Sequence, residues 1–311
     1  MNTVLILTIQ VIFILVFSPL MIGMVRKIKA RFQNRVGARI TQPYYDLAKL
    51  FHKDEVMSKD ASWIFRYAPY IVFASTVVVA AGIPLFSFLF INNALSDMLV
   101  VIYVLALGTF FLALAGLDTG SGFGGFGASR EMTISALAEG GLLFSIFTLA
   151  FSAGSTNLFS IAHAVSTLPL ISLVPVGIAF VAFVIALLAE TGRFPFDNPA
   201  THLELTMIHE AMILEYSGKR LALMEWASWN KFLIFIVLGI NLFLPWGMAS
   251  VFSISAIVIA FGLFMLKAFA FGVFIAILES SIAKLRFFRL PDMLFTSFIL
   301  SIIALSLVIV L

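Results

Sequence analysis

The sequence predicts an all-α fold, a polytopic membrane bundle of eight helices, and three observations carry that prediction. Of the 311 residues, 62% are hydrophobic and only 11% are charged, whereas a soluble domain carries about 25% charged residues. The apolar residues come in blocks of about 20, the length that crosses a membrane as a helix. No alternating β period occurs in these blocks, and backbone polar groups in hydrocarbon are satisfied within a helix.

The eight predicted spans follow one another in a single integral membrane domain, residues 1–311. We find no internal repeat, linker or low-complexity segment. The first span is too long for the apolar region of a cleaved signal peptide, and basic residues follow it instead of preceding it. The spans are expected near residues 3–25, 68–91, 98–117, 132–153, 169–190, 231–248, 251–278 and 292–311.

Basic residues predict which ends of the spans face the cytoplasm. Of the 19 Lys and Arg residues, 18 lie in the first, third, fifth and seventh loops. Positive residues concentrate on the cytoplasmic side, so we expect these odd loops to be cytoplasmic and both termini to be external, in a cell (inner) membrane. The exception is Lys267, in the middle of the seventh span. The pI of 9.2 therefore reflects topology, and nucleic acid is not expected as a partner.

The first cytoplasmic loop contains the sequence QPYYDLAKLFHKDEV. Its Leu47, Leu50 and Phe51 recur at helical spacing between polar residues. This pattern predicts an amphipathic helix that lies at the membrane interface.

The fifth loop and its flanks, residues 189–220, hold eight charged residues in 32 positions. Clustered carboxylates repel one another, which raises some of their pKa values toward neutrality, and such groups can relay protons. We interpret this loop as the mouth of an acidic ion path, with a solvated acidic loop as the alternative. The carboxylates between the fifth and sixth spans are Glu190, Asp197, Glu204, Glu210, Glu215 and Glu225.

Two ionisable residues fall well inside predicted spans. Glu139 lies in the fourth span and Lys267 in the seventh, where a charge costs about 2.5–3.5 kcal/mol on insertion scales. Such groups usually face a bundle interior or a water path, so we expect both to take part in ion transfer. A structural interhelical pair is the alternative. Glu190 and Glu279 end their spans, where simple hydration explains them equally well.

Two motif matches do not support a nucleotide or metal site. Residues 122–127, GFGGFG, match G-x-G-x-x-G but lie between two membrane helices instead of in a βαβ unit, so we expect a flexible cytoplasmic turn. His202 and His209 share a helix face with Glu210 near its edge. A metal site there is a weak hypothesis because the ligands are few, and we expect polar residues at a protein or water interface.

The chain contains no Cys. It therefore offers no thiolates for an iron–sulfur cluster or a Cys-ligated nickel site. Redox chemistry of that kind would belong to a partner, and no cofactor is expected in this chain.

Four segments together resemble one family. They are RVGARITQPYYDLAKLFHKDEV, GLDTGSGFGGFGASREMTISALAEG, ETGRFPFDNPATHLELTMIHEAMILEYSG and the stretch from Lys267 to Ser280. They resemble the complex I subunit 1 family, which includes the related membrane subunits of group 4 nickel–iron hydrogenases. The most specific motif is R-x-P-F-D-x-P, followed by E-L and E-Y-S-G. The short RVGARITQP and the GLDTGS…GASRE segment are similar to the hydrogenase branch, of the formate hydrogenlyase and hydrogenase-4 type.

The resemblance implies a membrane-anchor and ion-coupling subunit. In this family the odd loops dock a hydrophilic redox arm, and acidic residues lead an ion path toward antiporter-like subunits. The implied partners are nickel–iron hydrogenase large and small subunits, an iron–sulfur subunit and antiporter-like membrane subunits, besides lipid. The nickel–iron centre and the iron–sulfur clusters would lie in those partners. The residues that the motifs place in the path or its cavity are Glu139, Glu190, Arg193, Asp197, Glu204, Glu215 and Lys267.

Four further site residues rest on the sequence pattern and not on a family motif. Arg130 is the basic residue of the third loop and is expected at the docking surface. Glu210 is expected in the ion path, and His202 and His209 in the cavity. Two other functions stay open at this point: a quinone-site membrane subunit of a complex I-type NADH-quinone oxidoreductase, and a stand-alone ion transporter. A transporter would usually show internal repeats.

Overall fold

The computed structural model describes residues 3–58, 61–88, 94–197, 207–251 and 253–310. In these residues eight helices are long and apolar enough to cross a membrane, which confirms the predicted fold class. They are α1 (Thr3–Phe32), α3 (Trp63–Gly82), α4 (Met98–Asp118), α5 (Gly122–Ala153), α7 (Leu173–Glu190), α9 (Gly218–Leu242), α10 (Ile254–Ser281) and α11 (Leu290–Val310). The shorter helices are α2 (Gln42–His52), α6 (Leu158–Thr167) and α8 (His209–Ile213).

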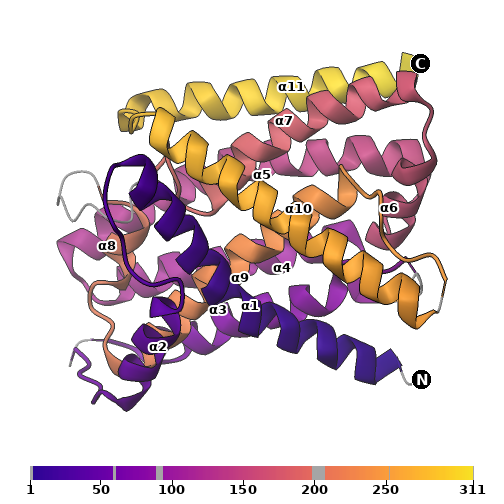
Figure 1. Cartoon of the computed structure of the whole chain (residues 1–311). Coiled ribbons are helices and arrows are strands. Elements are labelled where there is room, and N and C mark those ends of the chain that lie inside the picture. Colours follow the sequence, from indigo (N-terminus) through magenta and orange to yellow (C-terminus); the bar gives the residue numbers. More distant parts are fainter. Residues whose placement is uncertain (1–2, 59–60, 89–93, 198–206, 252, 311) are drawn as a thin grey trace.

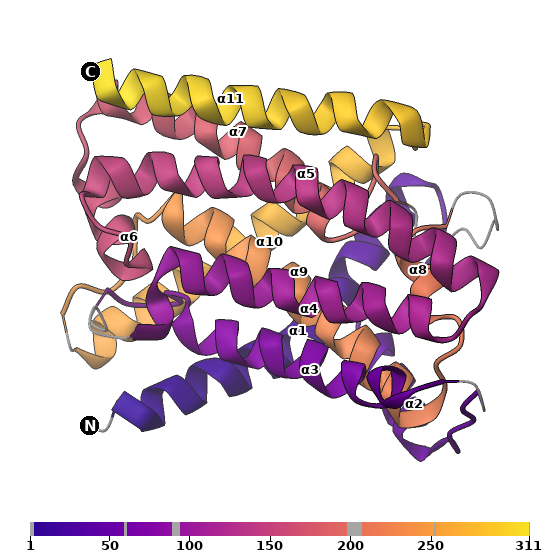
Figure 2. The same cartoon turned by 180° about the vertical axis from the view of Figure 1, so that it is seen from behind.

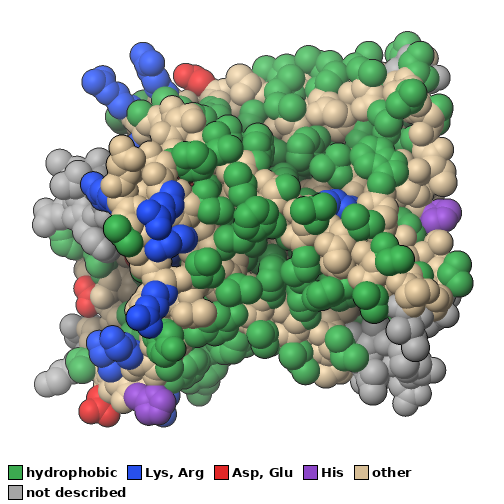
Figure 3. Space-filling model, in the orientation of Figure 1, with side chains coloured by type: hydrophobic (Ala, Val, Ile, Leu, Met, Phe, Trp, Pro, Cys, Tyr) green, Lys and Arg blue, Asp and Glu red, His purple; other side chains and the backbone are tan. Residues whose placement is uncertain are grey.

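The long helices run side by side in one bundle (Figures 1 and 2). Both chain termini lie at one end of it together with α6, and α2 and α8 lie at the other end. Lys and Arg side chains gather at the α2–α8 end, and a broad apolar face covers the rest of the view (Figure 3). An even number of crossings is thus seen directly, while the side of the membrane that each end faces stays a prediction.

Short polar side chains start several of the helices. The Ser62 hydroxyl accepts a hydrogen bond from Ile64 N at the start of α3, and the Asp97 carboxylate accepts one from Leu99 N at the start of α4. Such caps satisfy amide groups that have no partner within the helix. They place the beginnings of the spans at defined positions.

The α9 helix forms the centre of the bundle. Of its most apolar stretch 67% is buried, against 28% for α10 and 22% for α11. Its Asn230 joins two other spans by hydrogen bonds, since Ser18 of α1 donates to Asn230 Oδ1 over 2.6 Å and Asn230 donates to Thr76 of α3 over 3.3 Å. Polar groups inside the bundle are therefore paired across helices, as hydrocarbon requires.

The α5 helix is longer than expected and includes the glycine-rich motif. The sequence predicted a turn at residues 122–127, but Ser121 caps the helix and α5 begins at Gly122. The glycines allow close helix contacts instead: a Cβ at Gly127 would lie 2.8 Å from Ala211 Cβ of α8. Further along, a Cβ at Gly141 would lie 2.5 Å from Ser297 Oγ of α11. This part of the sequence prediction was wrong because glycine serves packing here.

Two other span edges differ from the sequence prediction. The second span ends at Gly82 instead of near 91, and the sixth begins at Gly218 instead of near 231. Lys231 is consequently not at the end of the fifth loop but more than three turns inside α9. The first loop does contain a helix, α2, whose Leu47 is buried against the bundle. That α2 lies along a membrane surface stays a prediction.

Candidate functional site: two polar cavities that share a wall

Four spans bring a chain of ionisable groups together inside the bundle. Lys231 Nζ of α9 donates to Glu190 Oε2 at the end of α7 over 2.8 Å and to Thr109 Oγ1 of α4 over 3.0 Å. On the other side of Glu190, the Ser135 hydroxyl of α5 lies 3.2 Å from Glu190 Oε1 and 3.3 Å from Glu139 Oε1. A hydroxyl has one hydrogen and two acceptor positions. Ser135 therefore bridges the two carboxylates, and either one, when protonated, can donate to it.

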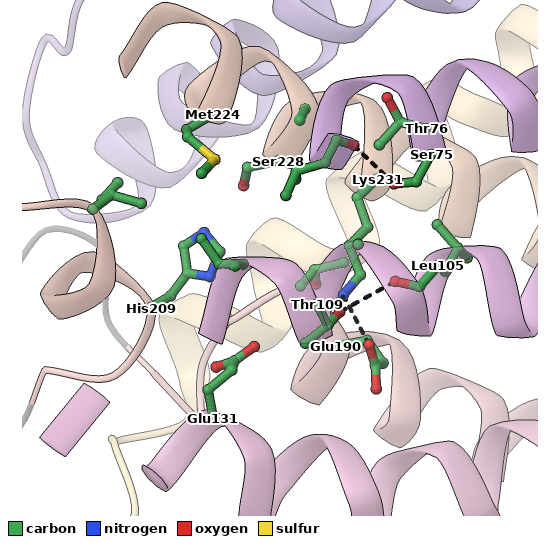
Figure 4. A pocket seen from close by; sticks show the side chains of 16 residues that line it. Ser75, Thr76, Leu105, Thr109, Glu131, Glu190, His209, Met224, Ser228 and Lys231 are labelled. Atoms are coloured by element: carbon green, nitrogen blue, oxygen red, sulfur yellow. Dashed lines mark hydrogen bonds and ion pairs between the residues drawn. The ribbon is translucent and has the colours of Figure 1, made fainter. Parts of the chain in front are cut away.

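A small polar cavity adjoins this chain. It has a volume of about 40 Å³, more than the roughly 10–15 Å³ that one water needs when measured in this way. Figure 4 shows His209, Glu131 and the Lys231–Glu190 pair around the same space. The polar groups in its wall are those that hold water or pass a proton: carboxylates, an ammonium, an imidazole and hydroxyls.

A larger cavity opens at the α2–α8 end of the bundle. Its volume is about 1040 Å³. The charged residues that line it are Arg26, Lys29, Arg35, Arg193, Glu210, Glu225 and Glu279. Both signs of charge therefore face the same space, and the aromatic rings of Phe194, Trp229 and Phe232 lie among them.

Three residues line both cavities: Thr191, His209 and Ser228. They form the wall between the large and the small cavity. His209 is held in this wall by its backbone, since His209 N donates to Asp197 Oδ2 over 3.1 Å. Asp197 is itself buried and accepts from Lys284 Nζ over 2.7 Å. The one titratable side chain of this wall thus has a fixed position.

Burial shifts the pKa values of two neighbouring groups outside the spans. It lowers the pKa of His209 from 6.5 to about 4, and Lys231 lowers it further while Asp197 opposes the shift. Burial and the nearby carboxylates Glu225 and Asp197 raise the pKa of Glu210 from 4.5 to about 7, with Arg26 opposing. At neutral pH the imidazole is therefore uncharged, with one nitrogen that donates and one that accepts, while Glu210 is close to half protonated.

Glu279 closes one side of the large cavity. Arg193 donates to its Oε1 over 2.6 Å and Lys29 to its Oε2 over 2.9 Å. The Arg193 guanidinium also lies 3.6 Å from the centre of the Phe232 ring. Through these contacts one carboxylate joins α1, α10 and the segment after α7.

Several site residues expected from the sequence lie elsewhere. Arg130 is at the α2–α8 end, where it donates to Met207 O over 3.1 Å. Glu215 is exposed just after α8 and lines neither cavity. Lys267 also lies outside both cavities and does not pair with Glu139; it donates to Leu244 O over 2.7 Å. His202 and Glu204 lie outside the residues that the structure describes.

Sequence reasoning missed two residues of the small cavity. Glu131 precedes the predicted start of the fourth span, yet the longer α5 buries it. Lys231 falls at the end of the predicted fifth loop, yet it lies inside α9. A search for every ionisable residue within one span length of the acidic loop would have found Lys231, and extending α5 back through its glycines would have found Glu131.

The family of the chain follows from comparison with known proteins. The profile of the NADH dehydrogenase family matches residues 4–311, nearly the whole chain. The chain belongs to this family. It is 35% identical to hydrogenase-4 component C of Escherichia coli over 95% of this chain and 92% of that protein. It is 32% identical to formate hydrogenlyase subunit 4 of the same organism, over 93% of this chain and 94% of that protein.

Other members of the NADH dehydrogenase family are more distant. An NADH-quinone oxidoreductase membrane subunit of Burkholderia vietnamiensis is 29% identical over 68% of this chain and 62% of its own length. The fold matches a chain in the solved structure of the membrane-bound sulfane sulfur reductase, described as an archaeal respiratory membrane complex. That match has a TM-score of 0.82 and covers 99% of this chain and 100% of the other, at 19% identity. The resemblance to the hydrogenase branch of the family is thus confirmed.

Proposed function

We propose that this protein is the membrane-anchor and ion-coupling subunit of a hydrogenase or formate hydrogenlyase-type complex. Its similarity to hydrogenase-4 component C and formate hydrogenlyase subunit 4 extends over nearly the full length of all three chains. The observation that supports an ion path is the shared wall: His209 faces both a large polar cavity and a water-sized cavity that holds the Lys231–Glu190 pair.

In the proposed path, protons enter through the large cavity. Glu210 lines this cavity, and its pKa of about 7 lets it take up and release a proton at neutral pH. Neutral His209 can accept a proton on one ring nitrogen and donate from the other, which carries it across the wall without a lasting buried charge. Glu131 and Glu190 lie on the far side of the wall.

The inner part of the proposed path runs along hydrogen bonds. A proton on Glu190 neutralises it and weakens its attraction for Lys231. The protonated carboxyl can donate to Ser135, and Ser135 to Glu139, because the distances are 3.2 and 3.3 Å. Lys267 is not part of this path, because it lines neither cavity.

The remaining features of the proposal concern partners and location. The α2–α8 end, with Arg130, would face the cytoplasm of a cell (inner) membrane and dock the hydrophilic arm. Nickel–iron and iron–sulfur centres would belong to hydrogenase subunits of that arm, because this chain has no Cys ligands. The positive charge gathered at this end (Figure 3) supports both assignments.

The decisive experiment measures redox chemistry and ion movement in the same vesicles. We compare the wild-type complex with Glu190→Gln and Glu139→Gln, which keep the shape of the side chain and remove its charge. The expected result is hydrogenase activity toward an artificial dye close to wild type, with proton uptake per electron reduced at least about tenfold, since general acid–base groups contribute about 10²–10⁴-fold to proton transfer.

Glu215→Gln is the matched control for these variants. It makes the same chemical change at an exposed carboxylate that lines neither cavity, and it should leave both activities unchanged. Normal proton uptake per electron in both buried variants would refute the proposed path. A complex without dye-linked hydrogen oxidation or evolution would refute the assignment to the hydrogenase type.

Quinone reduction is the second candidate, and the large cavity favours it. A volume of about 1040 Å³ with aromatic residues among the lining groups is at the upper end of small-molecule sites, about 300–1,000 Å³. Titrating the purified complex with a short-chain ubiquinone or menaquinone analogue distinguishes the two. Hydrogen-dependent reduction of the quinone that Glu279→Gln weakens would favour this candidate.

A further inference from the structure

Lys267 is a cation in the middle of a membrane-spanning helix, on a face that the chain leaves partly open. It lies 13 residues after Ile254 and 14 before Ser281, the two ends of α10, or about 20 Å along the helix from either end. Its Nζ donates to Leu244 O over 2.7 Å. Among the residues that the structure describes, it forms no ion pair.

The exposed face of α10 has the pattern of a helix that contacts another helix. Only 28% of its most apolar stretch is buried, compared with 67% for the central α9. Apolar side chains point outward every three or four residues, which places them on one stripe. The exposed stripe consists of Ile259, Leu263, Leu266, Ala270, Phe274 and Ile277. Figures 1 and 3 show α10 crossing the front of the bundle on this apolar face.

The surface beside this stripe is hollowed. A cavity of about 460 Å³ lies between α1 and α10 and is lined by Met21 and Met24 on one side and Gly262 and Met265 on the other. A Cβ at Gly262 would meet no atom within 4 Å. Small residues and hollows on a membrane face allow another helix to approach closely. At about 100° per residue, this hollow and Lys267 lie on opposite flanks of the stripe.

The position of Lys267 requires an acidic partner within the membrane. Charged residues inside spans almost always face a bundle interior and pair with another group, and Lys267 faces outward. The ammonium has three donors, and the Leu244 carbonyl takes one. Lipid phosphates lie at the edges of a hydrocarbon layer about 30 Å thick, which is farther from the middle of α10 than a four-carbon stem reaches.

We propose that the exposed stripe of α10 binds a membrane helix of a partner subunit, and that a carboxylate on this helix pairs with Lys267 Nζ. The bundle interior that a membrane lysine faces would then be completed by a second chain, and the hollow beside Gly262 would take an apolar side chain of it. This proposal does not depend on the ion path, because Lys267 lines neither of the two polar cavities.

The test uses the complex purified from membranes. A photoreactive p-benzoylphenylalanine replaces Leu263, one turn from Lys267, and the complex is irradiated before and after purification. The expected product is a cross-link to one membrane subunit, at a span that contains Asp or Glu. In parallel, Lys267→Met and Lys267→Arg are compared for the yield of that subunit in the purified complex.

Lys267→Met should lower the yield of the partner at least about tenfold, because it leaves a buried carboxylate without its cation. Lys267→Arg keeps the charge and should retain most of the partner. Methionine suits a membrane helix, and correct insertion of the Met variant is checked by size-exclusion profile in detergent. Cross-links to lipid alone, to a span without an acid, or an unchanged yield in Lys267→Met would each overturn the proposal.

Discussion

Lys231 and Glu190 form an ion pair of 2.8 Å inside the bundle, between the central α9 and the end of α7. Their side chains are 17% and 4% exposed, so water screens the pair little. The pair lies where the wall residue His209 meets the hydrogen-bonded route to Glu139. It is the point at which assembly of the helices and movement of a proton depend on the same two side chains.

Removing one partner of this pair should cost more than removing both. Lys231→Met leaves a buried carboxylate unpaired, and we expect a loss of about 3 kcal/mol of stability. The double variant Lys231→Met with Glu190→Gln should recover most of it, because no charge stays buried. Thermal unfolding in detergent measures both. The double variant should still lack proton uptake, and additive losses of stability would contradict a direct pair.

Labelling of single cysteines should reveal the topology, and the chain is suited to it because it has no native Cys. Thr167→Cys lies on α6, at the same end as both termini, and Lys219→Cys lies at the α2–α8 end. In intact cells a membrane-impermeant maleimide should label the first and not the second. Permeabilised cells serve as the control, in which both should react. The reverse pattern would invert the proposed orientation.

The pKa shifts of His209 and Glu210 should give opposite pH dependences of stability. Between pH 4 and 6.5 the unfolded state binds a proton at His209 that the folded state does not, so stability rises with pH. Between pH 4.5 and 7 the folded state holds a proton on Glu210 that the unfolded state has released, so stability falls with pH. In the wild type the two contributions largely cancel.

Single substitutions should therefore reveal each contribution. Glu210→Gln should make stability rise with pH between 4.5 and 6.5, and His209→Gln should make it fall. Each slope should be about 1 kcal/mol per pH unit, near the value for one proton. Melting temperatures of the purified complex across this range provide the measurement. Parallel curves for the wild type and both variants would show that these groups have ordinary pKa values.

The contacts of Glu279 predict a structural role for this carboxylate. Glu279→Gln would leave Lys29 and Arg193 without their shared anion, and we expect a loss of about 2–3 kcal/mol in stability. Glu55→Gln is the comparison, because its pair with Arg220 is more exposed, with the carboxylate 25% accessible, and should contribute at most about 1 kcal/mol. Equal losses in the two variants would contradict this difference in burial.

The sequence predicted the bundle well because membrane spans follow from local composition. Long apolar blocks and the distribution of basic residues required no knowledge of distant contacts. The α6 helix escaped prediction since its ten residues are too short to span a membrane. The candidate site was only partly predictable for a different reason. Glu190 and Glu139 stand out as charges in apolar runs, but their connection through Ser135 and Lys231 joins residues 41 to 55 positions apart, and one sequence does not encode which spans touch.

The long α5 helix has a mechanical consequence. It runs unbroken through 32 residues without a proline, which makes it a rod of about 48 Å. Its tightest approach to α11 is at Gly141 and Ser297, so this contact acts as the fulcrum of a lever. A push on the arm near Gly122 would swing Glu131 through a wide arc and barely move Glu139, which sits beside the fulcrum. A redox subunit docked at that arm could thereby open or close the outer half of the acid chain while the inner half stays in place.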